Sequence, residues 1–164
     1  MWTLPLPYIR RTSCRSDAWF ARMGSMTDKA DIRGKKTMLI VDDQALLRRT
    51  LHDFLQDAFP DYNFLDVADG ASALQACNAY RPVLVLMDIS LPDADGIELT
   101  ARLKKLYPGI HVIVVSYRSG EIYVQRALAA GARAYLVKDN LTTNLIPAVA
   151  AAIGVPPATE LGTS

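Results

Sequence analysis

The sequence predicts an α/β fold in which five βα units form a doubly wound parallel sheet. Five short apolar runs alternate with amphipathic segments from Thr37 onward, as expected of strands joined by crossover helices. The runs are continuously apolar, which is typical of strands that helices cover on both faces. The chain has 164 residues, 51% of them hydrophobic, which is enough to fill one core. We therefore expect one folded domain over 37–154.

The predicted strands define where a ligand site would lie. In chain order the runs are TMLIV (37–41), YNFLDVA (62–68), PVLVLMD (82–88), IHVIVVS (110–116) and AYLVK (134–138). A five-unit sheet of this kind commonly has the flavodoxin-like strand order 2-1-3-4-5, which places the first and third strands side by side at the topological switch point. Ligands bind there, beyond the carboxyl ends of the strands.

Helical spacing of apolar residues predicts the intervening helices. The first is indicated by Leu47, Leu51, Phe54, Leu55 and Ala58, and the third by Leu99, Leu103, Leu106 and Tyr107. The second, near 71–78, and the fourth, near 120–130, are less regular. The fifth helix runs from about Thr143 to Ile153, and it requires Pro147 to lie near its first turn because proline is poorly tolerated in a helix interior.

The two ends of the chain lack this periodicity. Residues 1–36 hold eight Lys and Arg against three Asp, and we interpret them as a disordered basic extension. Two alternatives are a nucleic-acid or membrane-surface arm, and a true start at Met23 or Met26. Residues 155–164 are predicted to form a C-terminal tail. No apolar run reaches the roughly 20 residues of a membrane span, and the two cysteines lack metal or disulfide spacing, so we expect a cytoplasmic protein.

Charged and polar residues follow the predicted strands at one edge of the sheet. Asp42 and Asp43 follow the first strand, Asp88 ends the third, Ser116 the fourth and Lys138 the fifth. Close carboxylates repel by about 4 kcal/mol per pair at an effective dielectric near 20, so a bare trio is unfavourable. A divalent cation removes the conflict, and hard oxygen ligands with room for water favour Mg²⁺ over Ca²⁺ or zinc.

This constellation suits phosphoryl transfer. The Asp88 carboxylate is a competent phosphoryl acceptor, while Lys138 and Ser116 offer a positive charge and a hydroxyl to the phosphoryl oxygens. Each residue alone has an ordinary structural interpretation: an Asp pair often caps a helix, and a strand-end serine or a solvated lysine is common. Only their joint placement at one edge favours a functional site.

Four stretches together resemble the receiver domains of two-component response regulators, most closely the NarL-type receivers. They are LIVDDQALLRRTL, VLVLMDISLPDADGIEL, VIVVS and AAGARAYLVKD, and they span the predicted domain. The resemblance implies that Asp88 is the phosphoacceptor. It also implies that Mg²⁺ is bound by Asp43, Asp88 and the backbone carbonyl of Ser90, with Asp42 acting mainly through a bound water.

The resemblance further implies a switch. Ser116 and Lys138 would contact the phosphoryl group, and Tyr135 would be the switch aromatic, although a tyrosine beside a strand is otherwise more often a core residue. Output would pass through the face formed by the fourth helix, the fifth strand and the fifth helix. The implied partners are a sensor histidine kinase or phosphotransfer protein, a downstream protein target and a phosphorylation-dependent second copy. We expect a phosphoacceptor signalling domain rather than an enzyme, with only slow self-catalysed phosphotransfer and dephosphorylation.

Two details depart from common receiver patterns. Asp139 follows Lys138 where many receivers have proline, and the NarL-type branch often has Asp at this position. The bulky Tyr117 follows Ser116 and predicts hindered access to the site. Ten residues follow Gly154, too few for a helix-turn-helix domain. We therefore expect a stand-alone receiver without direct DNA binding, the alternative being a truncated DNA-binding regulator.

Two further alternatives are a phosphatase and a receiver that has lost its phosphorylation. Phosphatases of the haloacid-dehalogenase type use a similar site, but they carry a second Asp two residues after the nucleophile, and position 90 is Ser. A receiver that folds but is never phosphorylated is also consistent with the fold. His52 and His111 lie away from the predicted strand ends, and we interpret both as structural.

Overall fold

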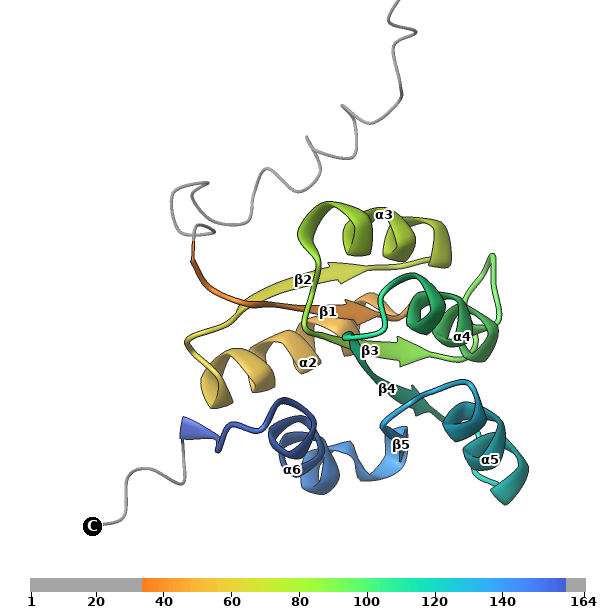
Figure 1. Ribbon diagram of the computed structural model, residues 1–164. Helices are drawn as coiled ribbons and strands as arrows, with labels where there is room; N and C mark the ends of the chain where they lie inside the picture. The colour runs from red at the N-terminus through yellow and green to blue at the C-terminus, as the bar shows by residue number, and fades with distance from the viewer. Residues whose placement is uncertain (1–33, 159–164) are drawn as a thin grey trace, which may run out of the picture. The chain divides into compact units, whose positions relative to one another are not determined.

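The computed structural model describes residues 34–158, and within them it contains one five-stranded parallel sheet (Figure 1). The strand order is β2-β1-β3-β4-β5, which confirms the predicted order 2-1-3-4-5. The strands are β1 (Thr37–Val41), β2 (Asn63–Val67), β3 (Leu84–Asp88), β4 (His111–Ser116) and β5 (Ala134–Val137). Every neighbouring pair is parallel, so all five carboxyl ends meet at one edge.

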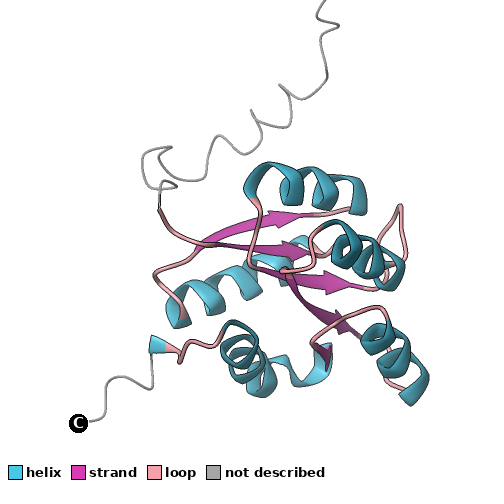
Figure 2. Cartoon of the chain, viewed as in Figure 1, coloured by secondary structure: helices cyan, strands magenta, loops and turns pink. Residues whose placement is uncertain are grey.

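Helices cover both faces of the sheet (Figure 2). They are α2 (Ala45–Ala58), α3 (Gly70–Tyr80), α4 (Gly96–Leu106), α5 (Glu121–Ala129) and α6 (Leu141–Ile153), with a 3₁₀ turn at Lys138–Asn140. On one face, α2 and α6 pack in one core cluster that includes Leu55, Leu86 and Val149. On the other, Ile97 of α4 and Ala127 of α5 pack against Val114 of β4.

Both helices that the apolar spacing predicts are present, but two of the residues that define the spacing do not face the core. In α2 the buried residues are Leu51, Leu55 and Ala58, whereas Phe54 is 44% exposed. Leu106, the last residue of α4, is 53% exposed. Apolar residues remain common on protein surfaces, so the spacing predicts the helix but overstates the width of its buried stripe.

The prediction for Pro147 was also wrong. Helix α6 begins at Leu141, so Pro147 is its seventh residue and lies beyond the first turn. A proline there cannot donate to the carbonyl of Thr143, four residues earlier. Both residues are exposed, so water can satisfy that carbonyl. The 3₁₀ turn that starts at Lys138 brings the chain into α6 earlier than the sequence pattern indicates.

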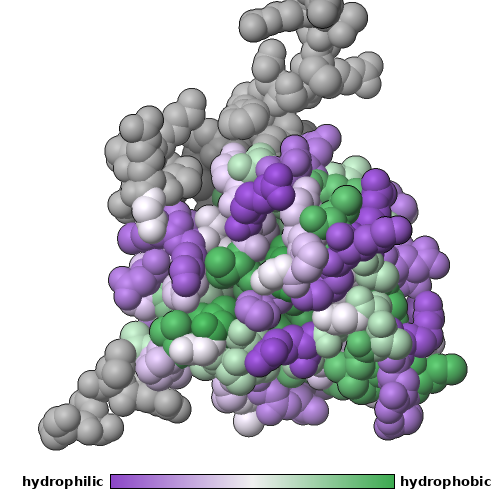
Figure 3. Space-filling view, viewed as in Figure 1, coloured by the Kyte–Doolittle hydropathy of each residue, from purple (hydrophilic) through white to green (hydrophobic). Residues whose placement is uncertain are grey.

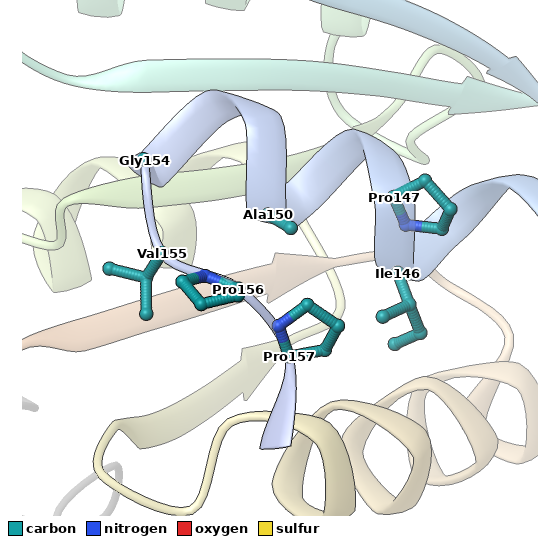
Figure 4. A pocket seen from close by; sticks show the side chains of 7 residues that line it. All are labelled: Ile146, Pro147, Ala150, Gly154, Val155, Pro156 and Pro157. Carbon is teal, nitrogen blue, oxygen red and sulfur yellow. The ribbon is translucent and has the colours of Figure 1, made fainter. Parts of the chain in front are cut away.

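The segment after α6 folds back on the helix. Gly154 adopts φ +71°, and the backbone N–H groups of Gly154 and Val155 donate to the Ala150 carbonyl at 2.9 and 3.2 Å. Pro157 is buried. The groove beside this segment has a volume of about 550 Å³. Figure 4 shows the residues that line it: Ile146, Pro147, Ala150, Gly154, Val155, Pro156 and Pro157. The predicted tail therefore begins with a packed segment.

The remaining predictions for the chain ends lie outside the described residues. These are the disordered extension, whose residues 1–33 are not described, and residues 159–164 of the tail. Within 34–158 no helix is both long and apolar enough to cross a membrane.

Candidate functional site

The sheet topology brings the acidic residues together. β1 and β3 are paired in register up to Val41 and Met87, so the next residues, Asp42 and Asp88, emerge side by side. Asp42, Asp43 and Asp88 each offer a carboxylate oxygen, and these oxygens lie within 4.8 Å of one another. Asp42 and Asp88 are buried, whereas Asp43 is exposed. This is the cluster that the strand ends predict.

Lys138 directly follows the carboxyl end of β5, and its side chain enters the cluster from there. Its Nζ lies 2.6 Å from Oδ2 of Asp42 and 3.2 Å from Oδ2 of Asp88. All three side chains are at most 5% exposed. The sequence places Lys138 near a phosphoryl group, but it does not reveal that this lysine pairs directly with both acids. The ammonium is close to both acids and offsets the repulsion between them.

Burial and charge act in opposite directions on these groups. Burial raises the pKa of Asp88, the nearby charge of Lys138 lowers it and the charge of Asp42 raises it again, leaving the pKa above its ordinary value. Burial lowers the pKa of Lys138, but the hydrogen bond and charge of Asp42, together with Asp88, raise it above its usual range. Lys138 is therefore an ammonium ion at neutral pH.

The donor set fits a hard divalent cation. The three clustered side chains present only carboxylate oxygens, the ligands that Mg²⁺ and Ca²⁺ prefer. Asp43 is exposed, so water can complete the coordination of a small ion that keeps several waters, as Mg²⁺ does. No Cys or His belongs to the cluster, which disfavours zinc. The acidic cluster is thus a site suited to a magnesium ion.

Ser116 and Tyr135 are linked through the backbone of Arg118. Ser116 ends β4, is buried, and its Oγ accepts a hydrogen bond from the Arg118 N–H at 3.2 Å. The Tyr135 hydroxyl donates to the Arg118 carbonyl at 2.7 Å. Arg118 also donates from its guanidinium to the Tyr123 hydroxyl at 3.1 Å, which ties this loop to α5. The hydroxyl predicted to touch the phosphoryl group and the predicted switch aromatic therefore both bond to the backbone of one loop residue.

Tyr117 lies over Lys138. The Nζ of Lys138 is 5.0 Å from the centroid of the Tyr117 ring, within the range of a cation–π contact. The ring is itself 56% exposed. The expectation of hindered access stays a prediction, but the ring is positioned on the side chain that a phosphoryl group would have to reach.

The loop after Asp88 has an anchor that sequence reasoning missed. The carboxylate of Asp93 accepts hydrogen bonds from the N–H groups of Gly70 and Ala71, at 2.7 and 2.9 Å, and so caps α3. These bonds lower the pKa of Asp93. Ser90, exposed in the same loop, donates its N–H to Oδ1 of Asp88 at 3.3 Å. No local signal could reveal the cap, because Gly70 and Ala71 lie 23 and 22 residues before Asp93 in the chain.

Gly96 closes this loop. Its N–H donates to the Ile89 carbonyl at 2.8 Å. A Cβ on Gly96 would lie 2.7 Å from the carbonyl carbon of Asp88 and 2.9 Å from the Cα of Ile89, where no real Cβ fits. Only glycine therefore allows α4 to start against the backbone of the residue that ends β3.

Arg48 is a second feature that the sequence did not reveal. Its guanidinium donates to the Asp42 carbonyl at 2.7 Å and to Oδ2 of Asp66 at 3.1 Å, which joins α2 to the ends of β1 and β2. The two histidines lie elsewhere, as expected: His52 contacts the Phe64 ring edge-on, and His111 begins β4 at the opposite end of the strand from Ser116. The groove in Figure 4 includes none of the predicted site residues.

A (βα)₅ sheet of this order, with an acidic cluster and a lysine at its carboxyl edge, is the arrangement expected of a phosphorylation-controlled signalling domain. The particular family follows from comparison, since residues 38–150 match the response regulator receiver domain, and the chain belongs to this family. Receiver domains of two-component response regulators act as phosphorylation switches, so the family-level interpretation of the sequence is confirmed.

Relatives support the assignment along the domain. The chain is 32% identical over 114 residues to the chemotaxis protein CheY of Halobacterium salinarum, covering 70% of this chain and 93% of CheY. It is 34% identical over 134 residues to the transcriptional regulatory protein PdtaR of Mycobacterium tuberculosis, covering 80% of this chain. The chain spans only 63% of PdtaR and 49% of the transcriptional regulatory protein DegU of Brevibacillus brevis.

Solved structures agree with the fold. A CheY-like receiver domain protein from Methanospirillum hungatei is 28% identical with a TM-score of 0.63, covering 74% of this chain and 98% of that one. A signal receiver domain assigned to NarL of Mycobacterium tuberculosis is 29% identical with a TM-score of 0.66, covering 73% and 98%. The expected NarL-type likeness is therefore present.

Proposed function

We propose that Asp88 accepts a phosphoryl group from the phosphohistidine of a sensor histidine kinase or phosphotransfer protein. The observation that carries the proposal is the pairing of Lys138 with both Asp42 and Asp88 inside a cluster of three carboxylates. A buried acid flanked by a fixed ammonium suits a group that must receive a dianion. The ammonium can keep its place while its partner changes from carboxylate to acyl phosphate.

The transfer is a displacement at phosphorus. A carboxylate oxygen of Asp88 forms a bond to the phosphorus while the bond from phosphorus to the donor imidazole nitrogen breaks, and that nitrogen keeps the electron pair. Lys138 offers its N–H donors to the phosphoryl oxygens. Ser116 donates its hydroxyl once its Oγ is released from the Arg118 N–H, 3.2 Å away. The product is an acyl phosphate that water hydrolyses slowly.

Magnesium is the cofactor that we propose for this step. Asp43, Asp88 and the backbone carbonyl of Ser90 would hold the ion, with Asp42 acting through a water. Bound Mg²⁺ neutralises the charge on the phosphoryl oxygens during transfer. The support is the hard oxygen donor set and the exposure of Asp43 beside two buried acids.

Phosphorylation would be transmitted through Ser116, Arg118 and Tyr135. Moving Ser116 toward the phosphoryl group breaks its bond to the Arg118 backbone, whose carbonyl also holds the Tyr135 hydroxyl at 2.7 Å. Tyr135 then repacks, and the change reaches α5 through the contact between Arg118 and Tyr123. New charge-assisted hydrogen bonds at the site are the source of the differential stability.

The output surface we propose is the α5–β5–α6 face, which corresponds to the fourth helix, fifth strand and fifth helix of the sequence prediction. Ile122 and Leu128 of α5 are exposed, and Figure 3 shows apolar surface over this helix. Such side chains suit a protein partner, either a downstream target or a second copy of this domain. We place the protein in the cytoplasm, where it acts by protein contact.

The phosphatase alternative is disfavoured by the residue at position 90. Ser90 has no carboxylate to act as general acid and base, and its backbone N–H donates to Asp88 instead. The proposal therefore retains Asp88 as an acceptor with slow turnover.

The test is phosphorylation of the purified chain with acetyl phosphate and Mg²⁺, read by intact mass. We expect the wild type to gain one phosphoryl group, and Asp88→Asn to gain none because an amide cannot form the acyl phosphate. Omitting Mg²⁺ is expected to reduce labelling at least about tenfold, since metal ions contribute several kcal/mol to charge stabilisation.

The matched control is Asp57→Asn, which removes an exposed carboxylate from the last turn of α2, at the opposite end of this helix from Asp42 and Asp43. It should label like the wild type. Labelling of Asp88→Asn at the wild-type level would overturn the assignment of the acceptor, and beryllofluoride with Mg²⁺ that left the NMR signals of Ser116 and Tyr135 unchanged would overturn the proposed switch.

A further inference from the structure

A second polar site lies at the opposite edge of the sheet, where β4 and β5 begin. It is a pocket of about 620 Å³, lined by Lys104, His111, Val112, Gly131, Ala132, Arg133, Ala134, Ala148, Ala151 and Ala152. Its charged or titratable lining residues are Lys104, His111 and Arg133, all basic. We call this site the cationic pocket. It shares no residue with the acidic cluster.

The position of Lys104 is fixed by the loop beneath it. Its Nζ donates to the carbonyls of Pro108 and Ile110, at 2.9 and 2.8 Å. These two bonds fix the ammonium against the loop and leave one of its three N–H donors for a ligand. Gly131, at φ +97°, lets the chain pass over the lysine stem, since a Cβ there would lie 2.9 Å from Cγ of Lys104. A fixed cation loses little conformational entropy on binding a ligand.

The charges in the cationic pocket are not balanced from within. Among residues 34–158, the structure gives Arg133 no carboxylate partner within ion-pair distance. Burial, and then the positive charges of Arg133 and Lys104, lower the pKa of His111. The charged side chains that act on this imidazole are therefore both basic, and neither has a carboxylate partner within ion-pair distance among residues 34–158.

The rest of the lining is small and apolar. Ala148, Ala151 and Ala152 project from α6, and Ala132 and Ala134 flank Arg133 at the start of β5. Methyl groups leave the pocket open and give it an apolar wall beside the cations. This combination fits a ligand with a compact anionic head and a small apolar body.

We propose that the cationic pocket binds a small phosphate monoester, with the phosphate on Arg133, Lys104 and His111 and the organic group on the alanine wall. The planar fork of Arg133 matches two phosphate oxygens, and Lys104 acts as a point charge. Protonated His111 adds a further donor. The two fixed cations, Arg133 and Lys104, together with an imidazole that a bound anion protonates, favour a dianionic head over the single charge of a carboxylate.

The test measures the pKa of His111 by NMR at constant ionic strength, with inorganic phosphate, phenyl phosphate or benzoate replacing chloride. Because bound anion favours the imidazolium, we expect phosphate to raise the pKa by about one unit. Phenyl phosphate should half-saturate the shift at a concentration at least about tenfold lower than benzoate, a difference of about 1.4 kcal/mol. A phosphoserine peptide that binds more tightly than phenyl phosphate would assign the phosphate to a modified protein chain instead of a small molecule.

Variants locate the binding. Arg133→Gln should reduce the phenyl phosphate affinity at least about fivefold, because a charge-assisted bidentate contact is lost. The matched control, Lys105→Gln, removes an exposed neighbouring charge from α4 that does not line the pocket and should leave the affinity unchanged. An unshifted His111 pKa at 50 mM phosphate, or equal losses in both variants, would overturn the proposal. Phosphorylation of Asp88 is read separately, so failure here leaves the proposed function intact.

Discussion

The sites at the two ends of β4 differ in how their charged side chains are compensated. At its carboxyl end, Ser116 borders a site where Lys138 pairs with Asp42 and Asp88, and all four residues are buried. At its amino end, His111 borders the open cationic pocket, where like charges lack carboxylate partners among the described residues. Buried charges demand compensation from the protein itself, whereas partly exposed ones are satisfied by water or by a ligand.

The largest expected loss of stability is at Gly96, which holds α4 against the end of β3. Gly96→Ala should lower the free energy of unfolding by more than about 4 kcal/mol, because its Cβ collides with the backbone of Asp88 and Ile89, which cannot move without opening β3. Urea unfolding monitored by circular dichroism measures this change.

Gly131→Ala is the counterpart at the other end. Its Cβ meets the flexible stem of Lys104 and it must adopt φ +97°, so we expect a smaller loss of about 1–2 kcal/mol. Equal losses for the two alanines would contradict the view that the loop at the acidic cluster is the more tightly constrained.

Removal of Lys138 tests the demand for internal compensation. Lys138→Met leaves Asp42 and Asp88 buried without their counterion, and breaking a buried ion pair in this way costs about 3–5 kcal/mol. Urea unfolding without divalent cations should show this loss, and added Mg²⁺ should restore part of it. Lys105→Met on the exposed face of α4 should change stability by less than about 0.5 kcal/mol.

The two ends should respond to pH with opposite sign. The folded pKa of Asp88 lies above its unfolded value of 3.8, so its contribution to stability falls as pH rises from 3.8 through the folded pKa. The folded pKa of His111 lies below its unfolded value of 6.5, so its contribution falls as pH drops from 6.5 through the folded pKa.

Difference curves against Asp88→Asn and His111→Gln isolate these contributions. The unfolding free energy of the wild type should fall relative to Asp88→Asn as the solution becomes less acidic, and relative to His111→Gln as it becomes more acidic. Slopes of the same sign in the two curves would show that one of the two environments is wrongly described.

The smallest expected effect comes from Arg133→Gln. It relieves like-charge repulsion in a solvated pocket, so stability should change by no more than about 0.5 kcal/mol, while the pKa of His111 moves up toward 6.5. Paired urea and NMR titrations measure both quantities. A loss of several kcal/mol would mean that Arg133 has a structural partner.

The sequence predicted the carboxyl edge well because the rules that apply there are topological. Once five parallel strands are recognised, Asp42 and Asp88 must emerge as neighbours, whatever the side chains around them. The interior of helices was less predictable. Phe54 fits the apolar spacing of α2 yet is exposed, and Pro147 lies inside α6 because its unpaired carbonyl partner can face water.

The missed parts of the site depend on long-range side-chain geometry. Asp93 lies in a loop and caps a helix 22–23 residues earlier, and Arg48 joins three segments through one guanidinium. Lys138 was expected near the phosphoryl group, but its pairing with Asp42 follows only from the position of the 3₁₀ turn. Periodicity and motif spacing carry no information about such contacts.

The built-in counterion at Lys138 has a consequence for how the domain fares when metal is scarce. Since the amino group of Lys138 already holds the acids together, the domain does not depend on a metal ion to stay folded, whereas the proposed phosphorylation does. We expect removal of divalent ions to stop the proposed phosphorylation of Asp88 while leaving the domain folded, so that the chain can respond again as soon as the ions return.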